Sequence, residues 1–130
     1  MNIGQAASAT NVSAKMIRYY ESIGLLAPAA RTGSGYRVYG ERELHVLRFI
    51  RRARKLGFSL DRIADLLSLW RDDGRASGDV KRIAIAHVAE LDQRIRELTE
   101  MRETLATLAD CCHGDDRPDC PILQTLAVDV

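Results

Sequence analysis

The sequence predicts a mainly α-helical protein with a winged helix-turn-helix domain, a long dimerisation helix that forms an antiparallel coiled coil, and a C-terminal loop with a short helix. Three observations support this prediction. Two short helical segments separated by a tight turn precede a glycine-containing hairpin pattern near the N-terminus. No proline and no further glycine interrupts the segment from Gly78 to about Asp110. All three cysteines follow this segment.

The charge of the chain is divided unevenly along its 130 residues. Residues 1–60 contain ten Lys or Arg and three Glu, whereas residues 61–130 contain nine Lys or Arg and fifteen Asp or Glu. A basic half joined to an acidic half indicates a nucleic-acid-binding head on a body that does not bind nucleic acid. We find no leader at Met1 and no apolar run of bilayer length. We therefore expect a soluble, cytoplasmic protein without a membrane partner, whose three cysteines are reduced.

Two short helices are predicted at the N-terminus. Asn2 can cap the first helix, which covers residues 3–9. Ser13 can cap the second helix, which covers residues 14–23, and Gly24 ends it. In a helix-turn-helix the second helix usually enters the major groove of DNA.

The second helix carries basic and apolar residues on different sides. Lys15, Arg18 and Tyr19 lie three to four residues apart or side by side and can share one face, which we expect to meet DNA. The residues that can turn toward the core are Met16, Ile17 and Tyr20.

A basic wing is predicted after these helices. Two glycines favour a hairpin tip, and the residues that follow them alternate as in a strand. We expect Arg31, Tyr36 and Arg37 to touch phosphates, and such contacts set position and affinity rather than sequence preference. Tyr39 is expected to pack inward beneath the wing.

Two further helices complete the predicted DNA-binding domain, residues 1–70. The first covers residues 41–56, and Ser59 can cap the second, which runs from residue 60 to about residue 70. Positive charge near a helix C-terminus interacts favourably with the helix dipole, so part of the cationic cluster on the first of these helices can be structural. The cluster consists of Arg48, Arg51, Arg52, Arg54 and Lys55.

The predicted dimerisation helix, residues 77–110, follows a polar linker at residues 71–76. Apolar residues recur along it every seven positions, which is the pattern of a coiled coil. Because a single helix of this length has too little of its own chain to pack against, we predict a twofold homodimer. His87 in this seam is expected to be a packed residue rather than a metal ligand. The positions spaced by seven are Ala84, Leu91, Leu98 and Leu105.

The C-terminal segment, residues 111–130, holds a loop between Cys112 and Cys120. Seven residues rich in Gly, Asp and Pro separate these cysteines, so the loop can fold back and bring the two sulfurs together. Thiolates select soft ions such as Cu(I). Pro121 can open a short helix whose N-terminus favours an anionic bis-thiolate complex. The spacing is not that of a zinc finger, and on spacing alone an inert or accidentally oxidised pair remains equally open.

Three motifs carry a resemblance that covers essentially the whole chain. They are Ile17-Arg18-Tyr19-Tyr20-Glu21, Gly24-Leu25-Leu26 and Gly35-Tyr36-Arg37-Val38-Tyr39. With the order of the predicted elements, they resemble the DNA-binding signature of the MerR family of metal-responsive transcription regulators. The resemblance implies a protein that is not an enzyme and that binds double-stranded promoter DNA as a homodimer. The predicted DNA-binding residues are Lys15, Arg18, Tyr19, Tyr20, Arg31, Tyr36, Arg37 and Arg54.

The segment from Cys112 to Leu123 is similar to the branch of that family that senses monovalent copper, silver or gold. The resemblance implies that Cys112 and Cys120 hold one Cu(I), or Ag(I) or Au(I), linearly as thiolates. In the zinc- and lead-type branches a further cysteine ligand stands at the start of the dimer helix. This chain has Ser77 there, which implies selectivity for a monovalent ion. Cys111 is additional to the two-ligand site.

The resemblance also implies a mechanism. The dimer lies between two promoter elements that are too far apart for RNA polymerase, and metal binding shifts the dimer helices so that the DNA is distorted and metal-efflux promoters are activated. A thiol-redox or divalent-metal (mercury or zinc) regulator of the same family remains an alternative. A thiol-dependent enzyme or metal chaperone is disfavoured, because no Cys-x-x-Cys pair, Ser/His/Asp set or phosphate loop occurs and the basic head would have no use.

Overall fold

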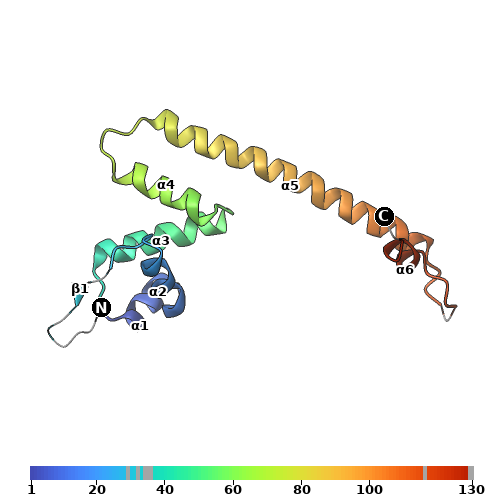
Figure 1. Ribbon diagram of the computed structural model, residues 1–130, viewed down its shortest axis with the longest axis horizontal. Helices are drawn as coiled ribbons and strands as arrows, with labels where there is room; N and C mark the ends of the chain where they lie inside the picture. The colour runs from blue at the N-terminus through green and yellow to red at the C-terminus, as the bar shows by residue number, and fades with distance from the viewer. Residues whose placement is uncertain (29, 32, 34–36, 116, 129–130) are drawn as a thin grey trace. The chain divides into compact units, whose positions relative to one another are not determined.

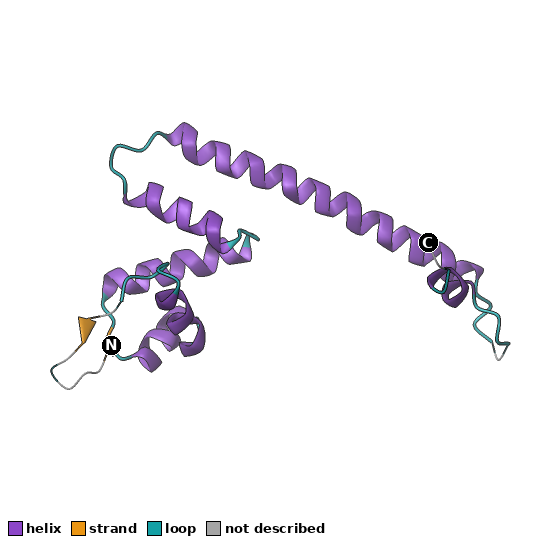
Figure 2. Ribbon diagram, in the orientation of Figure 1, coloured by secondary structure: helices purple, strands orange, loops and turns teal. Residues whose placement is uncertain are grey.

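The computed structural model describes residues 1–28, 30, 31, 33, 37–115 and 117–128, with only the backbone described for Ala30, Arg31 and Arg37. The described chain is mainly α-helical, as expected, with one small hairpin (Figures 1 and 2). It divides into two compact units, Met1–Ile83 and Ala84–Val130. In chain order, the elements are α1 (Ile3–Thr10), α2 (Ala14–Ser22), β1 (Ala30–Arg31), β2 (Arg37–Val38), α3 (Glu41–Lys55), α4 (Leu60–Arg71), α5 (Ser77–Cys111) and α6 (Pro121–Leu126).

The helix-turn-helix consists of α1 and α2, and both helices begin at the predicted caps. Asn2 Oδ1 accepts a hydrogen bond from the Gln5 N–H at 2.8 Å, and Gln5 Oε1 accepts one from the Asn2 N–H at 2.9 Å, which is a capping box. Ser13 Oγ accepts a hydrogen bond from the Met16 N–H at 3.2 Å. Between the two helices Asn11 has a left-handed φ of 58°. Asparagine tolerates this conformation better than most residues, so the chain can turn sharply there.

Helices α3 and α4 form the second helical pair of the first unit. The Gly40 N–H donates to Glu43 Oε2 at 2.9 Å at the start of α3. Gly57, with a φ of 86°, follows the end of α3 in a conformation that only glycine adopts without strain. Ser59 Oγ then accepts from the Arg62 N–H at 3.2 Å and caps α4, as predicted. The rings of Phe49 and Trp70 stack with centroids 5.2 Å apart.

One hydrophobic core holds the first unit together. Helices α1, α2, α3 and α4 all contribute aliphatic side chains to this core. Each fully buried valine, leucine or isoleucine side chain stabilises the fold by roughly 1.5–3 kcal/mol. Tyr39 is 1% exposed, which confirms that it packs inward. The largest fully buried side chains are Tyr39, Ile17, Leu26, Leu47, Ile50, Ile63 and Leu67.

The two strands of the predicted wing are present in the structure. Strands β1 and β2 pair antiparallel, with Ala30 opposite Val38 and Arg31 opposite Arg37. Tyr36 and the rest of the predicted tip, apart from Gly33, lie outside the described residues.

The second unit contains most of α5, the cysteine loop and α6. Helix α5 as a whole is 35 residues long and includes Cys111 as its last residue. Cys120 occupies the N-cap of α6 and Pro121 its first turn, as predicted. None of the described helices combines the length and the hydrophobicity that crossing a membrane requires.

Candidate nucleic-acid interface and candidate metal centre

The basic face predicted for α2 is exposed in the structure. Lys15, Arg18 and Tyr19 are all exposed, whereas Ile17 on the opposite side is fully buried. Because the buried side chain anchors α2 against the core, the helix presents the other three side chains in a fixed orientation. Such a face suits the major groove, which admits an α-helix.

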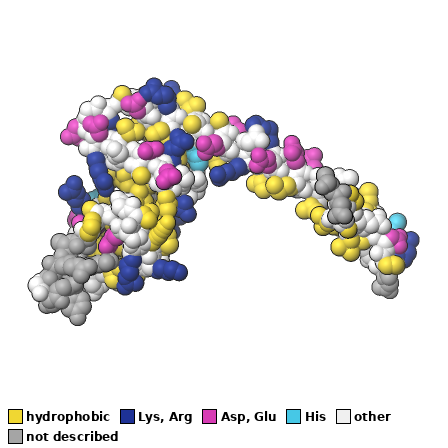
Figure 3. All heavy atoms as spheres, viewed as in Figure 1, with side chains coloured by type: hydrophobic (Ala, Val, Ile, Leu, Met, Phe, Trp, Pro, Cys, Tyr) yellow, Lys and Arg dark blue, Asp and Glu magenta, His cyan; other side chains and the backbone are white. Residues whose placement is uncertain are grey.

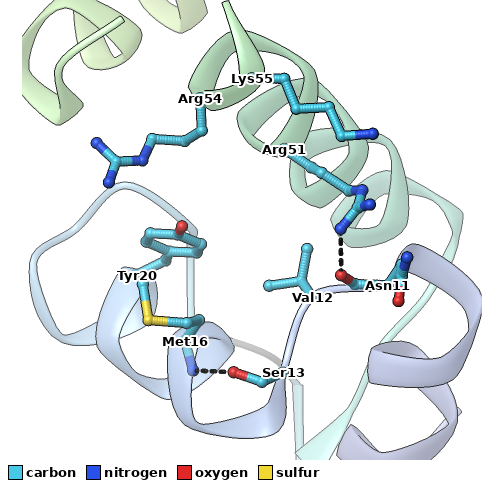
Figure 4. A pocket seen from close by; sticks show the side chains of 8 residues that line it. All are labelled: Asn11, Val12, Ser13, Met16, Tyr20, Arg51, Arg54 and Lys55. Atoms are coloured by element: carbon cyan, nitrogen blue, oxygen red, sulfur yellow. Dashed lines mark hydrogen bonds between the residues drawn. The ribbon is translucent and has the colours of Figure 1, made fainter. Parts of the chain in front are cut away.

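Tyr20 lies at the border between this face and the core. It is 5% exposed, which agrees with the expectation that it can turn inward. Its ring centroid lies 6.2 Å from that of Tyr19, and its side chain lines a hollow in the surface (Figure 4). Its contact with DNA stays a prediction.

The hollow lies between the turn of the helix-turn-helix and the C-terminal half of α3. It has a volume of about 410 Å³. On its α3 side it is lined by Arg51, Arg54 and Lys55, three members of the cationic cluster (Figure 4). Arg51 Nη1 donates a hydrogen bond to the backbone carbonyl of Asn11 at 2.6 Å. The other lining residues are Asn11, Val12, Ser13, Met16 and Tyr20.

Arg54 and Lys55 differ from Arg51 in their surroundings. Both are exposed, and within the described part of the chain no hydrogen bond or ion pair holds either side chain. Two cations without an internal partner at the rim of an open hollow can accept an anion, such as a phosphate of the DNA backbone.

The wing places two of the predicted phosphate-contacting residues opposite each other. Arg31 and Arg37 are cross-strand partners in the backbone register. Of their side chains the structure gives no description, and Tyr36 is outside the described residues.

The three cysteines lie at the two ends of the C-terminal loop. Cys111 is exposed at the end of α5, and Cys112 and Cys120 are both half-buried. The Cys112 thiol is among the groups that lower the pKa of Cys120, which agrees with a loop that folds back between them. That the two sulfurs form a metal site stays a prediction.

The position of Cys120 at the N-terminus of α6 favours its thiolate. Its side chain makes no cap hydrogen bond, but the nearby backbone N–H of Leu123 lowers the pKa of Cys120 more than any other group does. The backbone N–H of Ile122 and the Cys112 thiol lower this pKa further, and partial burial opposes them. The thiolate is the form of cysteine that binds metal.

The loop between the two cysteines is held by an ion pair. Arg117 Nη2 lies 2.9 Å from Asp115 Oδ2, and the Arg117 N–H donates to Asp115 Oδ1 at 3.0 Å. These contacts with Arg117 lower the pKa of Asp115. Gly114 has a φ of 66°, which allows the sharp bend before the pair.

The donor set near the cysteines is small. In the described portion of the chain no three or more His, Cys, Asp or Glu side chains converge in a way that could hold a metal ion. Structural zinc sites use four ligands, which is more than Cys112 and Cys120 supply. His113 and Asp119, the other nearby donors, are exposed.

Two further residues were singled out by their position on α5. Ser77 is the first residue of the helix and is exposed; its role in metal selectivity stays a prediction. His87 is 7% exposed, which agrees with a packed histidine, and its Nδ1 lies 3.7 Å from Glu90 Oε2 on the same helix.

Two contacts near the candidate sites were not predicted from the sequence. The hydrogen bond from Arg51 to Asn11 joins residues 40 positions apart, and the sequence marks Arg51 only as one of several cations on its helix. The influence of Leu123 on Cys120 comes from a backbone amide. Only the proline at the first turn of α6 signals that such amides face the cysteine.

The chain matches two family models. Residues 1–70 match the model described as "MerR HTH family regulatory protein", and residues 44–108 match "MerR, DNA binding". Together these matches cover most of the chain.

Similar proteins are found among characterised sequences and solved structures. The chain is 59% identical over 127 residues to "Heavy metal-dependent transcription regulator 2" of Rhizobium meliloti (strain 1021), which covers 98% of this chain and 86% of that protein. It is 44% identical over 127 residues to "HTH-type transcriptional regulator CueR" of Escherichia coli O6:H1, with 98% and 94% covered. The crystal structure of the transcription regulator PbrR691 from Ralstonia metallidurans CH34, in complex with lead(II), superposes with a TM-score of 0.84 at 34% identity and covers 98% of this chain and 99% of that one.

Proposed function

Because this chain belongs to the MerR family of helix-turn-helix transcription regulators and is not an enzyme, we propose that it is a regulator that senses a monovalent soft metal ion through Cys112 and Cys120. The effector is Cu(I), or Ag(I) or Au(I) in its place. The observation that carries this proposal is the position of Cys120 at the N-cap of α6, where the backbone N–H of Leu123 and, to a smaller extent, the Cys112 thiol lower its pKa. Reduced thiols require a reducing compartment, so we place the protein in the cytoplasm.

The chemistry of the two sulfurs favours a singly charged ion. Two thiolates around a +1 ion leave one net negative charge, which the positive end of a helix dipole stabilises. A bound Cu(I) would supply the positive charge that lets both thiolates stay close together. A zinc ion would require further ligands, and no cluster of three or more donors occurs among the described residues. Ser77, in place of a cysteine at the start of α5, supports the same choice by resemblance.

The relatives support a metal effector without deciding which one. Their printed names include a heavy metal-dependent regulator and CueR, and PbrR691 was crystallised with lead(II). Zn(II) would need more donors than Cys112 and Cys120, and Cys111 is a third sulfur next to Cys112 in the sequence. A divalent-metal or thiol-redox regulator is therefore the alternative outcome of the experiment below.

Promoter DNA is the proposed partner of the first unit. Lys15, Arg18 and Tyr19 form the exposed face of the second helix of the helix-turn-helix, the element that enters the major groove in such folds. Arg31, Tyr36 and Arg37 of the wing and Arg54 of α3 are proposed to bind phosphates on either side. Tyr20 lies next to Tyr19 at the buried edge of this face, and we propose that it also contacts the DNA.

A second copy of the chain is the proposed partner of α5. Of the apolar heptad positions, Leu98 is 63% and Leu105 53% exposed in the single chain, and their neighbour Met101 is 58% exposed, whereas Leu91 is half-buried. Figure 3 shows hydrophobic side chains gathered along part of the long helix. Exposed apolar surface of this extent marks an interaction site. A twofold dimer covers it and presents two helix-turn-helix units to a palindromic site.

The terminal helix is the proposed relay between the metal loop and the dimer. Ile122 is half-buried, whereas Leu123 and Leu126 are 65% and 72% exposed. We expect these side chains to dock on the dimer helix when the loop closes. Smooth bending of DNA by tens of degrees costs of order 1–6 kcal/mol. A conformational preference of that size in the dimer is enough to change the promoter shape that RNA polymerase meets.

The proposed function is tested by titrating the reduced protein with Cu(I), Ag(I), Au(I), Zn(II) and Hg(II) in the presence of a competing ligand. Transcription in vitro from a promoter that the protein binds is measured in the same samples. We expect tight binding and activation with the monovalent ions only. Activation by Zn(II) or Hg(II) alone, or by peroxide in the absence of metal, would support the alternative regulator.

A further inference from the structure

Arg51 is tied to the turn of the helix-turn-helix rather than left free. Its Nη1 donates to the Asn11 carbonyl at 2.6 Å, across 40 residues of sequence (Figure 4). Asn11 directly follows α1, and among the described residues it is the only one other than glycine with a positive φ. A charge-assisted hydrogen bond of this length is directional and stronger than a neutral one.

We infer that Arg51 is a positioning residue for DNA recognition: it holds the turn between α1 and α2 against α3 and thereby fixes the angle at which α2 meets the major groove. The inference rests on the proposed binding of DNA by this unit. Val12, next to Asn11, is 8% exposed and packs in the core. The turn therefore has two attachments, one apolar through Val12 and one polar through Arg51.

The neighbours of Arg51 show a division of roles within the hollow. Arg54 and Lys55 line the same hollow and are exposed, with no partner among the residues whose side chains are described. Arg51 is half-buried and already donates to a carbonyl. The first two residues are placed to neutralise a phosphate, whereas Arg51 is placed to orient backbone.

The two roles predict different binding behaviour. A side chain that only contacts a phosphate adds the same binding free energy for every DNA sequence. Its removal makes the slope of log affinity against log salt concentration shallower by about one. A residue that orients α2 contributes mainly to the preferred sequence, because base contacts require the correct angle of the helix. Loss of Arg51 should therefore reduce sequence discrimination and leave the salt dependence unchanged.

The experiment compares Arg51→Met, Arg51→Lys, Arg52→Met and Asn11→Gly with the wild-type full-length protein. The probes are a duplex that the wild-type protein selects from a random pool and a scrambled duplex of the same composition. Affinities for both are measured over a range of salt concentrations, at a temperature where circular dichroism shows each variant to be folded. Arg52→Met is the matched control, because Arg52 is an exposed neighbour on the same helix. Asn11→Gly keeps the carbonyl and the left-handed turn.

For Arg51→Met we expect about a tenfold loss in the ratio of selected to scrambled affinity, or about 1.4 kcal/mol, with an unchanged salt slope. Arg51→Lys should recover only part of the ratio, because an ammonium cannot reproduce the reach and direction of the guanidinium. Arg52→Met and Asn11→Gly should keep the wild-type ratio.

Equal weakening on both duplexes with a smaller salt slope would overturn the inference in favour of a phosphate contact. An Arg51→Met variant with the wild-type ratio would also overturn it. If Arg51→Met does not fold, a folded Arg51→Lys variant with the wild-type ratio has the same consequence. Wild-type protein that binds no duplex would instead refute the proposed function itself.

Discussion

Met1 and Tyr39 exchange two backbone hydrogen bonds. The Met1 amino group donates to the Tyr39 carbonyl at 2.9 Å, and the Tyr39 N–H donates to the Met1 carbonyl at 2.6 Å. Tyr39 directly follows strand β2, and Met1 directly precedes Asn2, the N-cap of α1. The two hydrogen bonds therefore fix the end of the wing to the start of the helix-turn-helix. The Tyr39 hydroxyl also donates to Glu21 near the end of α2. One buried tyrosine therefore joins the wing to both helices of the helix-turn-helix.

Tyr39→Phe tests this junction. The variant keeps the buried ring and loses the hydroxyl that donates to Glu21. Because a hydrogen bond to a charged group contributes roughly 1.5–3 kcal/mol, and part of that is screened at this half-buried site, we expect the free energy of unfolding to fall by about 1–2 kcal/mol. Urea denaturation measures it. Tyr19→Phe, at a 41% exposed position, is the control and should change stability by less than about 0.5 kcal/mol.

Replacement of seam residues tests the homodimer. Leu98→Glu combined with Leu105→Glu places carboxylates where the proposed dimer buries apolar side chains, so we expect the dissociation constant to rise at least roughly a hundredfold, which corresponds to about 2.7 kcal/mol. Sedimentation equilibrium measures it. Arg102→Glu, an exposed position on the same helix, serves as control and should remain dimeric. A double variant whose dimer dissociation constant equals that of the wild type would exclude α5 as the interface.

The lowered pKa of Cys120 predicts a pH dependence in metal-free protein. The amide of Leu123 and the other groups near the sulfur favour the thiolate in the folded state, so the folded pKa lies below the ordinary value of 9.0. The Cys120 thiolate therefore stabilises the folded protein at a pH above the pKa that Cys120 has in the unfolded chain. This contribution is lost as the pH falls through the pKa that Cys120 has in the folded protein. We expect alkylation of Cys120 by iodoacetamide to reach its half-maximal rate at a lower pH in folded protein than in urea.

Cys112→Ala, which removes the thiol donor and puts no hydroxyl in its place, refines the same measurement. Because the Cys112 thiol also lowers the pKa of Cys120, the variant should move the half-maximal pH upward. The move should be partial, since Leu123 has the larger influence. An unchanged alkylation profile in the variant would show that the two sulfurs do not interact in solution.

Alanine at Ile122, Leu123 and Leu126 tests the relay. The three side chains belong to α6, and the sulfur ligands do not depend on them directly. We expect metal affinity to stay within about threefold of wild type while metal-dependent transcription falls at least about tenfold. Thr125→Ala, an exposed position on the same helix, is the control. If the triple variant activates transcription as the wild type does, α6 has no part in the relay.

Local sequence signals predict most of the fold. Asn2, Ser13 and Ser59 all accept the backbone hydrogen bonds that cap their helices, because capping depends only on residues within one turn. Gly57 marks the end of α3 for an equally local reason, its positive φ. The heptad pattern likewise predicts α5 within one residue at its C-terminal end.

Contacts between distant residues could not be predicted in the same way. The sequence shows Arg51 only as one of several cations on α3, and its bond to Asn11 depends on how α1 and α3 pack. Tyr20 belongs to the family motif, yet its 5% exposure follows from the core around it. At the metal loop, the two cysteines and the proline are visible in the sequence. The backbone amides that act on Cys120 become apparent only when α6 is formed.

The central claim is that Cys112 and Cys120 together make the protein respond to a monovalent ion. It is tested most directly by Cys112→Ser, Cys120→Ser and Cys111→Ser in parallel, with Cu(I)-dependent transcription and DNA affinity measured for each variant. We predict that the first two variants bind the promoter but are not activated by Cu(I), and that Cys111→Ser is activated as the wild type is. Normal activation of Cys112→Ser or Cys120→Ser, or loss of activation in Cys111→Ser alone, would contradict the claim.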